Sequence, residues 1–140
     1  MNIVVYHNPE CGTSRNVVSI LESAGYQPTI IEYLETGWTR SQLIGLFAAA
    51  GLTPRDALRV SKSPAEEMGL TNLSVTDDEL LSAMVKNPIL VNRPFVCTPK
   101  GTRLCRPSEA VLDLIDRYPP GPFMKEDGSL LIDAEGRRVA

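Results

Sequence analysis

Histidine is nearly absent from this chain of 140 residues, and cysteine is scarce. The single histidine, His7, and the three widely spaced cysteines form neither a Cys-X-X-Cys pair nor a pattern of zinc ligands. An odd number of cysteines also argues against a disulfide scaffold. We therefore expect Cys11, Cys97 and Cys105 to be free thiols in a reducing compartment, with no metal site. Cys97 and Cys105 lie in strand-like runs and are predicted to be structural.

Long apolar runs and a strong charge of either sign are also missing. The formal net charge is −3, and acidic and basic residues are interspersed, which argues against a nucleic-acid or anionic-membrane partner. No stretch approaches the ~20 apolar residues of a membrane span, and the first residues show no secretory pattern, so we expect a cytoplasmic protein. A chain of this length, with 43% hydrophobic residues, suits a single domain over residues 1–140.

The N-terminal segment predicts a strand, a helix and a second strand. Residues 3–6 form a short apolar run, and apolar residues recur at helical spacing over 17–24. Residues 28–33 form a second run that is rich in branched side chains. A helix between two strands at this spacing predicts a parallel βαβ unit.

Signals for helix starts place most of the middle of the chain in helices. Capping boxes, in which threonine precedes Gln or Glu by three residues, occur at 39–42 and 76–79. Thr-Pro at 53–54 and Ser-Pro at 63–64 predict two further short helices. The buried stripe of the helix after residue 76 is predicted to consist of Leu80, Leu81, Met84 and Val85.

The last third of the chain predicts a β-hairpin, a helix and a tail. Residues 95–98 and 102–105 flank a Pro-Lys-Gly turn, and Pro107 opens the helix. We expect residues 118–140 to be a surface-bound C-terminal extension with a turn at 127–128.

The order of these elements suits an α/β fold, namely a thioredoxin-like mixed four-stranded sheet with flanking helices and a helical insertion. Pro94 stands at the start of the third predicted strand. In thioredoxin-like domains this position often holds a cis proline beside the active cysteine.

Cys11 lies where the first predicted strand gives way to the first helix. Unpaired backbone N–H groups and the positive end of the helix dipole point outward there, which favours anion binding and lowers the pKa of a thiol. A buried structural cysteine is the other interpretation, and it is the commonest fate of this residue type. The turn-forming residues around Cys11 favour the reactive thiol.

Two cysteine chemistries do not fit the residues after Cys11. A dithiol oxidoreductase would have a second cysteine three places on, but Ser14 stands there and cannot form a disulfide. A cysteine phosphatase would have an arginine six places on, where this chain has Val17, and Arg15 is the nearest substitute. What remains is a single activated thiolate at an anion-binding helix terminus, with arginines available for an oxyanion.

Arg93 and Arg106 are the better candidates for oxyanion binding, because both flank the hairpin that we expect to face Cys11. A structural role stays open for each, since most arginines cover the surface. His7 either helps to activate the thiolate or is a structural hydrogen-bonding residue. Ser14 either donates a hydrogen bond to the thiolate or is an ordinary residue of the first helical turn.

The sequence closely resembles the glutaredoxin-coupled arsenate reductases. The resemblance is carried by residues 6–9, 11–16, 33–36, 87–94 and 101–109, and the tail at 125–128 is also similar. It implies that the thiolate of Cys11 attacks arsenate and expels water, and that glutathione then adds to the arsenic. Glutaredoxin removes the glutathione as a mixed disulfide, so that arsenic passes from the +5 to the +3 state and leaves as arsenite.

The resemblance also implies roles for further residues. In that family, residues that match Arg59, Arg93 and Arg106 bind the oxyanion, and residues that match His7, Ser14 and Arg15 support the thiolate. Around Arg59, residues 55–63 resemble the family less than their flanks do. No bound cofactor is implied, because the electrons come from glutathione as a co-substrate and from glutaredoxin as a partner. External thiols would also explain the missing second cysteine.

Two other functions stay open. A thioredoxin-like regulator that binds RNA polymerase commonly carries a Cys-X-X-Cys switch, and Ser14 argues against it. The second open function is that of a glutathione-binding relative that does not reduce arsenate. Recovery of polymerase subunits with the protein would support the regulator, whereas arsenate-driven, glutathione-dependent oxidation of NADPH in a coupled assay would support the enzyme.

Overall fold

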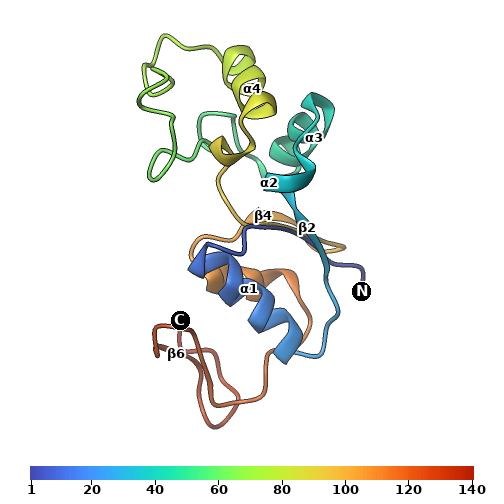
Figure 1. Cartoon of the computed structure of the whole chain (residues 1–140). Coiled ribbons are helices and arrows are strands. Elements are labelled where there is room, and N and C mark those ends of the chain that lie inside the picture. Colours follow the sequence, from blue (N-terminus) through green and yellow to red (C-terminus); the bar gives the residue numbers. More distant parts are fainter. The chain divides into compact units, whose positions relative to one another are not determined.

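The computed structural model describes residues 1–140, which form two compact units. The first unit consists of Met1–Ile31 and Arg93–Ala140, and the second consists of Glu32–Asn92. Figure 1 shows the course of the chain through both units. The prediction of a single domain over residues 1–140 stays a prediction.

A four-stranded sheet has the order β2-β1-β3-β4. Its strands are β1 (Val4–His7), β2 (Thr29–Glu32), β3 (Phe95–Thr98) and β4 (Gly101–Leu104). β3 runs antiparallel to both β1 and β4. β1 and β2 are neighbours joined by helix α1 (Gly12–Ser23), the crossover that parallel strands require. The predicted mixed sheet of thioredoxin-like type is therefore confirmed.

Helix α1 and the 3₁₀ segment η2 (Ser108–Leu114) pack together in the first unit (Figure 1). A 3₁₀ helix stands where we predicted an ordinary helix, and Pro107 is its N-cap rather than its first residue. With three residues per turn, a 3₁₀ helix aligns Ser108, Val111 and Leu114, and all three are buried. This tighter winding places one row of side chains against the core.

The tail after residue 118 contributes a second, two-stranded sheet, made of β5 (Phe123–Met124) and β6 (Leu130–Ile132). Asp127 and Gly128 lie in the turn between these strands, as predicted, and Gly128 N donates to Lys125 O at 2.9 Å. Leu131 and Ile132 are fully buried in the hydrophobic core that also contains residues of α1 and η2.

The second unit is mostly helical. It contains α2 (Tyr33–Thr36), α3 (Arg40–Ala50), α4 (Asp77–Lys86) and the 3₁₀ turn η1 (Pro88–Leu90). Both predicted capping boxes are confirmed, at the starts of α3 and α4. Val85, however, is 36% exposed and does not belong to the buried stripe of α4. At 3.6 residues per turn, the buried side chains of Leu80, Met84 and Leu81 span about 100° of the helix, and Val85 lies about 40° beyond Leu81, at the edge of that face.

The two short helices predicted after Thr53 and Ser63 do not form, and both segments are turns. Both cap hydroxyls still accept a nearby backbone N–H. After the first cap, Leu58 leaves helical geometry because it pairs with Val91 in an isolated β-bridge. After the second cap, Gly69 ends the turn in the left-handed region, with φ of 73°. No helix of the chain has both the length and the apolar composition needed to cross a bilayer.

Candidate active site

Cys11 is the N-cap residue of α1 and is 7% exposed. The turn before it is closed by Cys11 N, which donates to Asn8 O at 3.0 Å, and the helix begins with Arg15 N donating to Cys11 O at 2.9 Å. The side chain of Asn8 is buried and accepts from Glu10 N at 2.9 Å, which forms an Asx turn. Asn8 therefore fixes the turn that presents the thiol, a role that we did not assign from its Asn-Pro signal.

The thiol of Cys11 has a lowered pKa. Burial by itself raises the pKa, because it disfavours the thiolate. A hydrogen bond from the backbone N–H of Ser14 and the positive charges of Arg93 and Arg106 outweigh that effect. Arg106 Nη1 donates a hydrogen bond to the Cys11 sulfur at 3.6 Å. Cys11 is therefore more readily ionised than an ordinary cysteine.

The two arginines that act on Cys11 lie next to each other in the first unit. Arg106 Nη1 also donates to the carbonyl oxygen of Arg93 at 3.2 Å. Each arginine precedes a cis proline, and the cis bond at Pro94 confirms the prediction for the start of the third strand. Arg93 is buried, which keeps its charge close to the thiol rather than in solvent. The structure thus brings together the predicted nucleophile and two of the predicted oxyanion ligands.

Ser14 and His7, which lie on either side of Cys11 in the sequence, form a hydrogen-bonded pair. His7 Nδ1 lies 2.6 Å from Ser14 Oγ, which also accepts from Asn8 N at 3.1 Å. The hydroxyl of Ser14 is therefore occupied by His7 and Asn8, and the hydrogen bond to Cys11 comes from the Ser14 backbone. This differs from the hydroxyl donor that we considered from the sequence. Ser14 is fully buried, whereas His7 is half-buried.

Arg15 binds a residue of the C-terminal tail. Its Nε and Nη2 donate to both carboxylate oxygens of Glu126, at 2.9 and 3.1 Å, and its Nη1 donates to Pro9 O at 2.8 Å. The hydrogen bonds between these side chains raise the pKa of Arg15 and lower the pKa of Glu126. Sequence reasoning missed Glu126, because 111 positions separate it from Arg15 and no local pattern marks such a contact.

Arg59 lies in the second unit, where it is buried. Its Nε donates to Ser61 O at 3.0 Å, and its backbone N donates to Leu90 O at 2.8 Å. Its role as a third oxyanion ligand stays a prediction.

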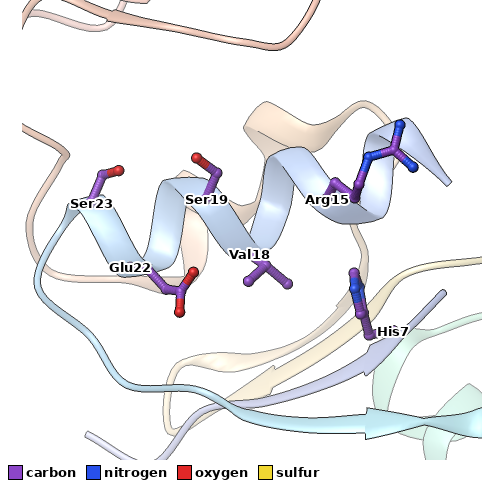
Figure 2. A pocket seen from close by; sticks show the side chains of 6 residues that line it. All are labelled: His7, Arg15, Val18, Ser19, Glu22 and Ser23. Carbon is purple, nitrogen blue, oxygen red and sulfur yellow. The ribbon is translucent and has the colours of Figure 1, made fainter. Parts of the chain in front are cut away.

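A pocket of about 280 Å³ lies along α1. Figure 2 shows His7 and Arg15 towards one end of the helix and Glu22 and Ser23 at the other. The lining residues are His7, Arg15, Val18, Ser19, Glu22 and Ser23. Arg15, which is paired with Glu126, therefore lies at one end of the pocket and Glu22 at the other, with the hydroxyl of Ser19 between them.

The other two cysteines differ from Cys11 in their surroundings. Cys105 is fully buried, and that burial raises the pKa of its thiol to about 12. Cys97 is half-buried on β3, opposite Thr102 of β4. No group of three or more His, Cys, Asp or Glu side chains is arranged to hold a metal ion.

Comparison with known proteins places this site in a family. The model of the ArsC family matches residues 6–114. Arsenate reductase ArsI2 of Synechocystis sp. is 66% identical over 137 residues, which cover 98% of each chain. The arsenate reductase of Escherichia coli (strain K12) is 50% identical over 99% of this chain and 98% of its own. The solved arsenate reductase from Vibrio cholerae is 36% identical, with a TM-score of 0.78, over 82% of this chain and 98% of that one.

Proposed function

Because the chain belongs to the ArsC family, we propose that it is an enzyme that reduces arsenate to arsenite, with Cys11 as the nucleophile. The observation that carries the proposal is the contact between the Cys11 sulfur and Arg106, with the charge of Arg93 beside it. A thiolate next to two arginines suits attack on a tetrahedral oxyanion, since the planar guanidinium binds such oxygens with paired, charge-assisted hydrogen bonds. The arsenate reductases at 50–66% identity support arsenate as that oxyanion.

In the first step the Cys11 thiolate attacks the arsenic of arsenate. A sulfur–arsenic bond forms, one arsenic–oxygen bond breaks, and the oxygen leaves as water after taking up protons. Arg93 and Arg106 hold the remaining oxygens, and the positive end of the α1 dipole favours an anion at the same place. The resemblance to the arsenate reductases also implies that Arg59 binds the oxyanion, and this role stays a prediction. His7, Ser14 and Arg15 support the turn that presents the thiolate.

In the second step the thiol of glutathione displaces another oxygen as water and becomes bound to the arsenic. A glutaredoxin thiolate then attacks the glutathione sulfur, so that a disulfide forms and the sulfur–arsenic bond breaks. The electron pair of that bond stays on arsenic, which passes from +5 to +3. Water finally displaces arsenite from Cys11 and restores the thiol. We propose the pocket along α1, which His7 and Arg15 line, as the place where glutathione binds.

Two external thiols thus supply both electrons, so that neither a second cysteine nor a bound cofactor is needed. We propose the cytoplasm as the compartment, since glutathione keeps thiols reduced there.

The test is a coupled assay with arsenate, glutathione, glutaredoxin, glutathione reductase and NADPH. We expect NADPH oxidation that requires arsenate and glutaredoxin, that Cys11→Ser abolishes, and that the matched Cys97→Ser leaves largely intact. If the protein is folded and shows no arsenate-dependent turnover, the proposal is wrong. It would favour a glutathione-binding relative or a polymerase-binding regulator, which pull-down of polymerase subunits would identify.

A further inference from the structure

The turn at Lys125 and Glu126 joins the two segments that carry Cys11 and Arg106. We propose that Lys125 and Glu126 are positioning residues, which set the contact between the Cys11 sulfur and the Arg106 guanidinium from the C-terminal tail. The inference rests on the proposed function, because that function makes Cys11 the nucleophile.

Glu126 binds the nucleophile side of the site. Its carboxylate accepts hydrogen bonds from Nε and Nη2 of Arg15, and its backbone N donates to Asn16 Oδ1 at 3.0 Å. Both partners lie in the first turns of α1, four and five positions after Cys11. Arg15 in turn donates to Pro9 O, which lies in the turn before Cys11. Glu126 therefore holds the chain on both sides of the thiol.

Lys125 binds the arginine side of the site. Its Nζ lies 2.9 Å from Glu109 Oε2, and Glu109 is three positions after Arg106. The two side chains are only 18% and 14% exposed, so water screens this pair less than an ion pair on the open surface. The pair ties the tail to the start of η2, directly after the residue that donates to Cys11.

The turn that carries the two residues is closed by its own hydrogen bonds. Gly128 N donates to Lys125 O, and Lys125 N donates to Ser129 O, both at 2.9 Å. Asp127 Oδ1 accepts from the backbone N and the hydroxyl of Ser129, at 2.9 and 2.6 Å. Because the turn is held in one conformation, Lys125 and Glu126 act on the site together. We call this turn, residues 125–129, the brace.

The brace completes a closed chain of contacts. It runs from Cys11 along α1 to Glu126, through Lys125 to Glu109, and back along the chain to Arg106, whose Nη1 lies 3.6 Å from the Cys11 sulfur. A hydrogen bond to sulfur at this distance weakens quickly when either partner moves away. Loss of the brace therefore costs the thiolate part of its stabilisation, while the burial that disfavours the thiolate remains.

The test is the double variant Lys125→Met/Glu126→Gln, which removes one cation and one anion and leaves the net charge unchanged. The rate of Cys11 alkylation by iodoacetamide is measured against pH, with mass spectrometry of the Cys11 peptide. We expect the pH of half-maximal rate to rise by about 0.5 to 1 unit, a fraction of what a directly contacting charge contributes. The matched control is Lys100→Met/Asp116→Asn, which loses a 2.8 Å ion pair of the same unit away from Cys11. It should keep the wild-type profile.

An unchanged or lowered midpoint in the double variant would overturn the proposal, as would an equal rise in the control. A lower melting temperature with an unchanged profile would show a merely structural contact. If the double variant does not fold, the single variant Glu126→Gln, at an exposed side chain, must show a rise in the same direction. Removing this anion without repositioning would instead lower the midpoint. The readout needs no arsenate, so its failure and the failure of the proposed function are separate results.

Discussion

At Cys11, burial and charge act on the thiol in opposite directions. At Cys105 burial prevails and raises the pKa to about 12, although the charge of Arg103 acts against it. At Cys11 the hydrogen bond from Ser14 N and the charges of two arginines prevail, and the pKa falls. The same residue type is thus inert at one position and ionisable at the other, and the difference comes from which donors the fold brings near.

The lowered pKa of Cys11 means that its thiolate persists to a lower pH than the thiolate of an ordinary cysteine. Arg106→Gln removes a hydrogen bond and a charge but leaves the burial, so the midpoint of Cys11 alkylation should move to higher pH by about 1 unit or more. The measurement is the pH profile of the reaction with iodoacetamide. Arg103→Gln, which removes an exposed arginine paired with Asp113, is the matched control. An unchanged midpoint in Arg106→Gln would show that this arginine does not stabilise the thiolate.

The contrast between Cys11 and Cys105 also predicts selective labelling. In the folded protein at neutral pH, iodoacetamide should modify Cys11 well before Cys105, because the thiolate is the reactive form and the pKa of Cys105 is raised to about 12 while that of Cys11 is lowered. Cys105 is also fully buried, whereas Cys11 is 7% exposed. Peptide mapping of a time course checks this. In denaturant the two should react at similar rates, and equal rates in the folded protein would contradict the assignment of the reactive thiol.

The residues of the site could be predicted where the signal was local. His7, Cys11 and Ser14 lie close together in the sequence, from the end of β1 to the first turn of α1, and Arg93 lies beside a proline at the start of a strand. Glu126 carries no such signal, since only the folded chain brings it to Arg15.

At the scale of elements, predictions that rest on neighbouring residues are correct, and those that a distant contact decides are wrong. The capping boxes that open α3 and α4 use only neighbouring residues, and both form. The caps at Thr53 and Ser63 also bind a backbone N–H, but no helix follows them. After Thr53, the β-bridge between Leu58 and Val91 prevents a helix, and Val91 lies far along the chain.

The capping box of α4 predicts a measurable loss of stability. Thr76 Oγ1 accepts from Glu79 N at 3.1 Å, and Glu79 Oε1 accepts from Thr76 N at 3.2 Å. Thr76→Ala should lower the free energy of unfolding by about 1 kcal/mol in urea titrations followed by circular dichroism. Thr71→Ala, at an exposed position outside the helices, should have little effect. An equal loss in both variants would mean that the cap contributes nothing.

At the scale of the whole molecule, the C-terminal tail supplies both a brace for the site and part of a core. Leu131 is fully buried in the first unit among side chains of α1 and η2, whereas its neighbour Leu130 is 40% exposed. The turn that carries Lys125 and Glu126 directly precedes these two residues. Anchoring of β6 in the core is therefore what gives the brace a fixed point from which to hold Arg15 and Glu109.

The pair of adjacent leucines tests this anchoring. Leu131→Ala should lower the free energy of unfolding of the first unit by roughly 2 to 5 kcal/mol, because it leaves a cavity that the surrounding core fills only partly. Leu130→Ala makes the same chemical change at a half-exposed site and should cost much less. Reaction of Cys105 with a thiol reagent along a urea gradient reports unfolding of this unit, since that thiol is fully buried in its core. Similar costs for the two leucines would mean that the tail lies on the surface, and the brace would then have no anchor in the core.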